Sequence, residues 1–369
     1  MDAHRGLPYS MAAGLHRQPT GGQTCRRTSP LWTFLVARPT LASPAVNREL
    51  PLITIIIPTK PGQSEIAAVT AARSLDYPDD KVEVIVARGR QPAVQRNTAL
   101  REARGELIYF LDDDSRPLPG NLRRAIGSFQ RPTVQMLGGP NLCPPDAPPI
   151  EKVFAVVLAS WLAFGPSRAR YAPVGHVRTT SEKELILCNM MARRDALLEL
   201  GGFDESLYPN EENALMDELQ KRGAELLYDP EFAVHRRPRA TLGAFCRMLM
   251  NYGRGRAEQF RTHPTPGSAL NFVPPLFCVY LLAATPISLW LGALALAPLA
   301  LYAIAVLAQT AASIPAHGVL RALAAMPLLV ASHVFYGLGF WRGLFTTLKP
   351  PGQKSNVEVT LERASLRGP

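Results

Sequence analysis

The chain has 369 residues, of which 47% are hydrophobic and 19% are charged, and its formal net charge is +10. This length allows about two or three domains with large cores, and the composition excludes a fully disordered chain, a collagen and a small disulfide scaffold. The excess basic residues lie in two segments, 1–48 and 236–261, so the remainder is close to neutral. Because no domain has the broad basic face of a nucleic-acid-binding protein, we expect no nucleic-acid partner.

Residues 1–48 are rich in Arg, Gly, Pro and Ser and show little hydrophobic periodicity. Their apolar run at 31–37 is short for a signal peptide. We expect a disordered basic tail, and the alternatives are a transit peptide or residues that precede a later start at Met11. The five cysteines of the chain have no metal-ligand spacing, which favours reduced, unpaired thiols in a cytosolic domain.

The segment 49–262 alternates strand-like and helix-like runs. Continuous apolar runs bounded by turn residues are typical of buried parallel strands. Alternation with helices predicts a doubly wound α/β sheet, in which ligands bind beyond the carboxyl ends of the strands. The expected strands are 52–57, 82–86 and 107–111, and the expected helices between them are 64–75 and 92–104.

Three adjacent carboxylates, Asp112, Asp113 and Asp114, follow the expected strand 107–111. Mutual repulsion would raise their pKa values, and a bound cation relieves this repulsion. Oxygen ligands favour Mg²⁺ or Mn²⁺, and Mg²⁺ commonly uses one or two carboxylates together with substrate phosphates. The alternative is an acidic loop that caps a helical turn beginning at Pro117.

A second acidic pair, Glu211 and Glu212, precedes a helical run at 214–222. The dipole at a helix N-terminus favours ionised carboxylates, which suits one member of the pair to act as a general base. The alternative is the ordinary enrichment of acidic residues in the first turn of a helix.

The C-terminal third of the chain is poor in charge, with no Lys, Arg, Asp or Glu between residues 262 and 320. Three apolar runs at about 273–291, 293–309 and 319–341 each approach the roughly 20 residues that a membrane-spanning helix needs. A soluble bundle would need polar outer faces, which these runs lack. We therefore expect about three transmembrane helices within 263–349, followed by a polar tail at 350–369.

The basic cluster 236–261 precedes the first apolar run, so the positive-inside rule predicts that residues 49–262 lie in the cytoplasm. Arg254 and Arg256 in this cluster are also suited to hold a lipid-linked pyrophosphate or anionic headgroups. Three spans would leave the basic tail 350–369 on the opposite side of the membrane. Either the rule fails here or one apolar run does not span.

Five motifs in order make the chain resemble family 2 glycosyltransferases with the GT-A fold. Each motif is weak alone, but their order over residues 49–240 is specific. An Asn-Glu-Glu-Asn box and a YGRGR run are similar to those of the exopolysaccharide-type branch, whose members carry C-terminal membrane helices. The motifs are ITIIIPTK at 53–60, RNTAL at 96–100, GELIYFLDDDS at 105–115, GGFDE at 201–205 and EENAL at 211–215.

The resemblance implies a Rossmann-like, nucleotide-sugar-binding GT-A domain at 49–262, with the Asp triplet as its DxD motif. It also implies an inverting, metal-dependent transfer of a sugar from a nucleotide-diphosphate sugar to a lipid-linked or glycan acceptor. The expected location is the inner (plasma) membrane, with several membrane passes and a cytoplasmic catalytic domain. Membrane lipids are the remaining expected partners. The implied donor-nucleotide residues are Pro58, Thr59, Arg96, Asn97, Asp112 and Asp113. The implied metal ligands for Mg²⁺ or Mn²⁺ are Asp114, Asp112 and His235. The implied catalytic pair is Glu211 and Glu212, with Glu212 as the base.

Two departures from the family pattern bear on the donor and the base. The second strand ends in Arg88 and Arg90 where the family often has an Asp-rich element, and the catalytic pair is Glu-Glu where the family has Glu-Asp.

The other hypotheses are a non-catalytic membrane scaffold with a degenerate transferase domain, and a nucleotidyl- or phosphotransferase. The intact acidic residues argue against the scaffold, and the absence of a phosphate-binding glycine loop argues against P-loop chemistry.

Overall fold

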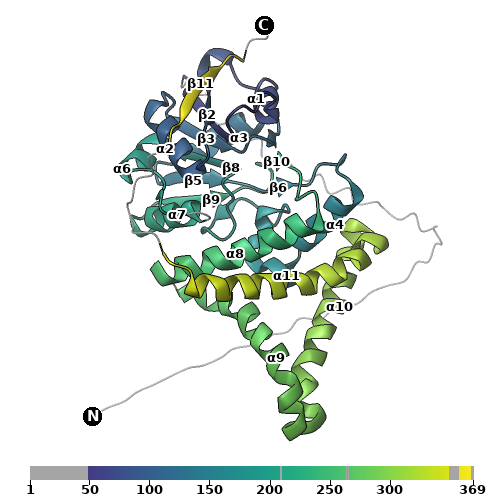
Figure 1. Ribbon diagram of the computed structural model, residues 1–369. Coiled ribbons are helices and arrows are strands. Elements are labelled where there is room, and N and C mark those ends of the chain that lie inside the picture. Colours follow the sequence, from purple (N-terminus) through teal and green to yellow (C-terminus); the bar gives the residue numbers. More distant parts are fainter. Residues whose placement is uncertain (1–48, 208–209, 263, 265, 349–356, 367–369) are drawn as a thin grey trace, which may run out of the picture. The chain divides into compact units, whose positions relative to one another are not determined.

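The computed structural model describes residues 49–207, 210–262, 264, 266–348 and 357–366, so the predicted disordered tail at 1–48 lies outside the described residues. An eight-stranded mixed sheet forms the centre of the segment that begins at Glu49 (Figure 1). Its strands, in spatial order, are β11 (Thr360–Ala364), β2 (Val82–Arg88), β1 (Ile53–Thr59), β3 (Leu107–Leu111), β8 (Asn189–Arg193), β5 (Val134–Gly138), β9 (Glu225–Tyr228) and β7 (Arg178–Thr179).

Strand β1 lies inside the sheet, parallel to both β2 and β3. Its alternate side chains enter two hydrophobic cores, with Ile55 on one face and Ile56 on the other. Helices pack on both faces, as a doubly wound sheet requires. The first core includes α1 (Ala67–Ala72) and α3 (Asn121–Phe129), and the second includes α2 (Pro92–Glu102), α6 (Arg194–Glu199) and α7 (Glu211–Lys221).

The predicted α/β sheet followed by long apolar helices is confirmed. The sheet is not parallel throughout, because β8 runs antiparallel to both β3 and β5. A second sheet joins β4 (Arg116–Pro117), β10 (Val234–His235) and β6 (Asn141–Leu142). Since β4 directly follows the Asp triplet and β10 pairs with it, this small sheet brings the start of the basic cluster to the carboxyl end of β3.

Two long helices, α8 (Leu242–Thr262) and α11 (Val319–Phe345), pack along each other beside α4 (Pro149–Leu158). Glycines permit their close approach. A Cβ atom on Gly253 would lie 2.0 Å from the carbonyl oxygen of Tyr336, and one on Gly339 would lie 2.0 Å from that of Met250. The third expected transmembrane segment is therefore in large part a packing partner of α8.

Between α8 and α11 the chain forms an apolar helical arm (Figure 1). Its helices are α9 (Val273–Leu291) and α10 (Ala297–His317), preceded by the 3-10 turn η3 (Pro266–Phe272) and separated by the turn η4 (Gly292–Leu296). By length and composition, two helical stretches, Ser268–His317 and Val319–Phe345, could cross a membrane, or three if the bent pair at 149–158 and 161–170 is one span. Trp290, beside η4, has 91% of its surface exposed.

The C-terminal segment that was expected to be only a polar tail contains strand β11. It pairs antiparallel with β2 from Thr360 opposite Arg88 to Ala364 opposite Val84. Two ion pairs fasten it, Arg88 to Glu362 at 3.0 Å and Arg363 to Glu83 at 3.1 Å. The chain therefore returns to the sheet after the apolar helices.

Candidate active site

Two carboxylates of the Asp triplet meet one arginine at the carboxyl end of β3. The guanidinium of Arg236, just after β10, lies 3.2 Å from Asp112 Oδ2 and 2.5 Å from Asp114 Oδ1. Burial alone would raise the pKa of Asp112, but the charges of Arg236 and Arg96 hold it below its usual range. Asp112 is therefore an anion in the folded protein at neutral pH.

Arg96 on α2 joins this carboxylate to the glutamate pair at the start of α7. Its side chain is buried and lies 3.1 Å from Asp112 Oδ1 and 3.2 Å from Glu211 Oε1. Burial, followed by the charge of Glu212, raises the pKa of Glu211 to about 7, against the opposing charge of Arg96. Two buried polar atoms at this junction, Arg96 Nε and Glu211 Oε2, have no hydrogen-bond partner among the described residues.

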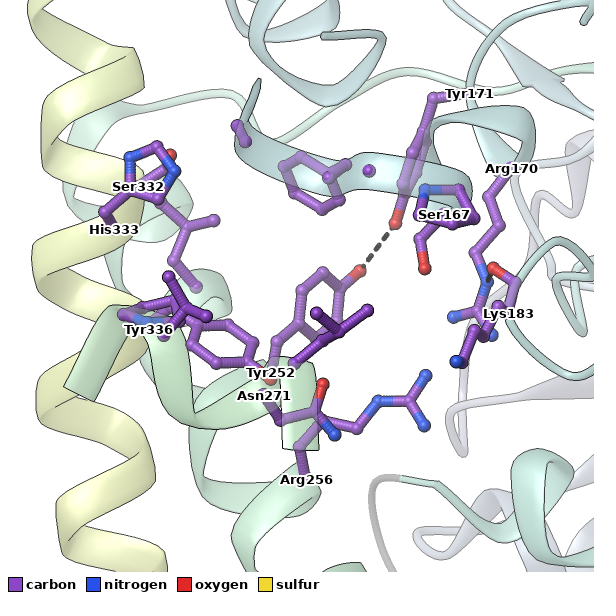
Figure 2. A pocket seen from close by; sticks show the side chains of 18 of the residues that line it. Ser167, Arg170, Tyr171, Lys183, Tyr252, Arg256, Asn271, Ser332, His333 and Tyr336 are labelled. Atoms are coloured by element: carbon purple, nitrogen blue, oxygen red, sulfur yellow. Dashed lines mark hydrogen bonds between the residues drawn. The ribbon is translucent and has the colours of Figure 1, made fainter. Parts of the chain in front are cut away.

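Glu212, unlike Glu211, is one of the residues that line a cavity of about 430 Å³. Figure 2 shows other residues of this cavity. The wall of this cavity comes from α5 (Trp161–Phe164), the 3-10 turn η2 (Gly165–Arg170), α8, η3, the start of α9, and α11. One glutamate of the pair thus holds Arg96, and the other borders open space that a second reactant can enter.

The predicted donor-nucleotide residues at the end of β1 lie in a hydrogen-bonded turn. The hydroxyl of Thr59 donates to Gln63 Oε1 at 3.0 Å, and its carbonyl accepts from Gln95 Nε2 at 2.8 Å. Pro58 precedes it in register with Ala87 of β2. Arg88, at the end of β2, donates to the carbonyl of Gln63 at 2.7 Å.

Asn97, also predicted to contact the nucleotide, holds the GGFDE loop. Its amide nitrogen donates to the carbonyl of Phe203 at 2.8 Å and to Glu205 Oε1 at 2.9 Å, and its amide oxygen accepts from the backbone of Phe203. Gly202, at φ 84°, passes so close that a Cβ atom there would lie 2.3 Å from Asn97 Oδ1. Because these contacts occupy its polar atoms, Asn97 positions the loop beside α2.

No three His, Cys, Asp or Glu side chains form a group that could hold a metal ion within the described part of the chain, so the set of Asp112, Asp114 and His235 is not assembled as one. His235 is paired in the backbone with Arg116. Asp112 and Asp114 nevertheless converge on a single cationic group. Their oxygens fit a hard divalent cation in place of Arg236, with the remaining ligands from substrate phosphates or water. Asp113 is half-buried and contributes its carbonyl to the backbone amide of Ala68.

Arg236 is the main residue of this site that sequence reasoning missed. It was counted only as part of a juxtamembrane basic cluster, and its pairing with the Asp triplet depends on the short sheet that joins β4 and β10. Arg256 of the predicted acceptor pair lines the cavity. Arg254 is not among the lining residues and lies 3.5 Å from Glu258 on the same helix.

The fold and the site define an α/β protein with an acidic and arginine-rich cluster at the carboxyl ends of its strands, followed by helices of membrane-spanning length. Residues 62–201 match the family described as "Glycosyl transferase family 2". This segment, which is less than half of the chain, is similar to glycosyltransferase family 2.

Curated relatives resemble part of the chain. It is 29% identical over 174 residues to a pre-mycofactocin glycosyltransferase of Mycobacterium tuberculosis, which covers 47% of this chain and 36% of that protein. It is 30% identical over 205 residues to the succinoglycan biosynthesis protein ExoA of Rhizobium meliloti, which covers 53% of this chain and 56% of that protein. The chain thus spans about a third to somewhat over half of these relatives' length.

Among solved structures, a mannosyltransferase of Pyrobaculum calidifontis in complex with GDP-Man and Mn²⁺ aligns with 80% of this chain and 88% of that chain. The sequence identity is 20% and the TM-score is 0.48.

Proposed function

We propose that the protein is an inverting glycosyltransferase that moves a sugar from a nucleotide-diphosphate sugar to a hydroxyl of a lipid-linked or glycan acceptor. The observation that carries the proposal is the bridge made by Arg96, which joins Asp112 of the donor site to Glu211. Next to Glu211, Glu212 borders the cavity. One continuous set of contacts thereby links a site suited to a diphosphate with a base suited to an acceptor.

In this mechanism Pro58, Thr59 and Arg96 border the nucleotide, and Asp112 and Asp113 bind its ribose and phosphates. Asp112 and Asp114 would be the protein ligands for Mg²⁺ or Mn²⁺. When bound, the metal supplies neutralising charge for the departing diphosphate.

Glu212 accepts the proton of the acceptor hydroxyl while that oxygen forms a bond to the anomeric carbon. The bond from this carbon to the diphosphate oxygen breaks on the opposite face, and the diphosphate leaves with the electron pair. A single displacement of this kind inverts the anomeric configuration without a covalent enzyme intermediate.

Strand β11 supports a membrane arrangement with an even number of crossings. Because β11 pairs with β2, both strands lie on the same side of any membrane that the intervening helices cross. The arm of α9 and α10 supplies two helices of about 28 and 32 Å, close to the roughly 30 Å hydrocarbon core. We propose that this arm spans the inner (plasma) membrane, and that the domain at 49–262, α11 and the C-terminal tail are cytoplasmic.

This topology agrees with the distribution of positive charge. Arg321, Arg342 and Arg363 then lie on the same side as the basic cluster 236–261, as the positive-inside rule requires. The conflict that three spans would create disappears. The name of the ExoA relative refers to succinoglycan biosynthesis, which supports a role of this protein in the synthesis of a cell-surface or extracellular polysaccharide.

Transfer by the purified full chain in detergent, with a panel of nucleotide sugars and Mn²⁺, tests the proposal. Glu212→Gln should lower kcat by about 10²–10⁴-fold, and Asp112→Asn should weaken binding of the nucleotide sugar. Glu218→Gln, an exposed position on the same helix that faces Arg222 at 3.4 Å, is the matched control. Binding of no nucleotide sugar, or full transfer by Glu212→Gln, would favour the non-catalytic scaffold or another chemistry.

A further inference from the structure

The cavity beside Glu212 has cations at one end, and its other end is formed by aromatic and apolar side chains together with a few uncharged polar ones. Figure 2 shows Arg170, Lys183 and Arg256 on one side of the space and His333 and Tyr336 of α11 on the other. Its volume of about 430 Å³ lies within the range of small-molecule sites. The apolar lining includes Trp161, Leu162, Leu249, Val273 and Pro274.

The three cations at the polar end have no carboxylate partner within ion-pair distance among the described residues. Arg256 donates to Gln259 Oε1 at 3.0 Å, and Arg170 donates to Asn213 Oδ1 at 2.8 Å and to the backbone carbonyls of Glu182 and Lys183. Burial, together with the charge of Arg170, lowers the pKa of Arg256. Holding two guanidinium groups and an ammonium group beside one partly buried space is costly without a counter-anion.

Two carboxylates, Glu182 and Glu212, also line the cavity, so its cations outnumber its anions by one. Arginine pairs with phosphate through two parallel N–H···O bonds, and this geometry makes it the usual residue of phosphate sites. A phosphate or diphosphate would satisfy the free donors of Arg170 and Arg256 at the polar end.

The apolar end leads toward the helices of membrane-spanning length. Val273 and Pro274 open α9, and Tyr336 lies on α11. Trp161 has 59% of its surface exposed, which is unusual for so large an apolar side chain outside a binding or membrane surface. A ligand that fills both ends must therefore join an anionic group to an apolar chain.

We propose that this cavity binds the acceptor as a phosphate or diphosphate ester of an apolar chain, with Arg170, Lys183 and Arg256 around the phosphate. The inference rests on the proposed transferase function and specifies its acceptor class. The apolar chain lies against Trp161 and Pro274. The hydroxyl-bearing part of the acceptor extends toward Glu212 on the same wall.

Calorimetric titration of the full chain in dodecyl maltoside tests this site. The probe is farnesyl diphosphate; farnesol lacks the phosphates and inorganic diphosphate lacks the chain. We expect farnesyl diphosphate to bind at least about tenfold more tightly than either fragment. Arg256→Gln or Arg170→Gln should weaken it by about tenfold or more, and Arg256→Lys by less, because it keeps the charge.

The matched control is Arg247→Gln, which removes the same charge from an exposed position on α8 whose side chain does not line the cavity. Equal loss in Arg247→Gln and Arg256→Gln, or equal affinity for farnesol and farnesyl diphosphate, would overturn the proposal. Vesicles of phosphatidylglycerol distinguish the source of the phosphate, because displacement of the probe by them would make this a headgroup site and not an acceptor site. Melting temperatures within about 2 °C of the wild type would show that each variant is folded.

Failure of this inference is separable from failure of the transferase proposal. Probe binding that depends on Arg256, with no binding of any nucleotide sugar, would refute the transferase and keep the phosphate site. Normal donor binding and transfer to a phosphate-free acceptor, unchanged in Arg256→Gln, would refute the phosphate site alone.

Discussion

Removal of Arg236 should make the Asp triplet bind Mn²⁺ more tightly in the absence of nucleotide. The guanidinium of Arg236 lies 3.2 Å from Asp112 and 2.5 Å from Asp114, so a cation that uses both carboxylates must displace it. Arg236→Gln removes this internal competitor and leaves the carboxylates in place. Arg96 still holds one oxygen of Asp112 at 3.1 Å.

The size of the effect follows from how exposed these ion pairs are. The side chains of Arg236, Asp112 and Asp114 have 22%, 25% and 48% of their surface exposed. Partly exposed pairs are each worth up to about 1 kcal/mol, so breaking two costs about 1–2 kcal/mol. Since about 1.4 kcal/mol is a tenfold change in affinity, Arg236→Gln should lower the Kd for Mn²⁺ by roughly 5- to 30-fold.

The assay is titration of free Mn²⁺ by electron paramagnetic resonance at fixed ionic strength. Arg239→Gln is the control, since exposed Arg239 acts on Asp112 through its charge but forms no ion pair among the described residues, while the net charge changes equally. Equal or weaker Mn²⁺ binding by Arg236→Gln relative to Arg239→Gln would refute the reasoning, because it would mean that Arg236 does not compete with the metal for Asp112 and Asp114.

Three further predictions address the glutamate pair, the C-terminal strand and the helix packing. Burial raises the pKa of Glu211 to about 7, so ionisation of this residue destabilises the folded state as the pH rises from about 4.5 to 7. The melting temperature of Glu211→Gln minus that of the wild type should therefore increase between pH 5 and pH 8. A constant difference would contradict this prediction. Deletion of residues 357–369 removes β11 and its two ion pairs and should lower the free energy of unfolding of the sheet domain by about 1–3 kcal/mol in urea titrations, whereas an unchanged midpoint would show that β11 adds nothing. Gly339→Ala places a Cβ atom 2.0 Å from the carbonyl oxygen of Met250 and should lower the free energy of unfolding by about 1–3 kcal/mol in the same titrations. The control Gly127→Ala, where a Cβ atom would meet nothing within 4 Å, should be neutral or stabilising. Equal effects of the two substitutions would argue against close packing of α8 and α11.

Local patterns were sufficient to predict the parts of the fold whose cause is local. The third expected strand at 107–111 agrees with β3 at both ends, because it is a continuous apolar segment that ends at the Asp triplet. The expected helix at 64–75 is shorter in the structure, where α1 covers Ala67–Ala72. Residues 64–66 are irregular, with Ile66 in an extended conformation, and residues 73–75 form a turn and a bend.

The parts that were not predicted depend on contacts between distant segments. Strand β11 has a short and polar sequence, and what makes it a strand is the free edge of β2. Likewise, the close packing of the apolar run at 319–341 against α8 depends on glycine contacts between distant segments, although the run also has the length and composition of a membrane span. Neither feature has a periodicity of its own that a sequence pattern could detect.

The candidate site shows the same division. The acidic residues were found because Asp112 and Glu212 stand at the ends of recognisable elements. Arg236, Arg170 and Lys183 were not found, because each reaches its place through an irregular segment or a strand of two residues. Their common property is positive charge next to acids or a cavity, which becomes visible only when the chain is folded.

The position of β11 in the chain also constrains the order of synthesis and folding. The ribosome makes β2 early and β11 only after both helices of the apolar arm, so the outer edge of β2 stays unpaired throughout that interval. An unpaired strand edge is a template for aggregation, and the wait at translation rates of about 5–20 residues per second lasts more than ten seconds. The sheet is therefore completed only after the whole apolar arm has been made, and in the proposed topology its completion coincides in time with insertion of the arm.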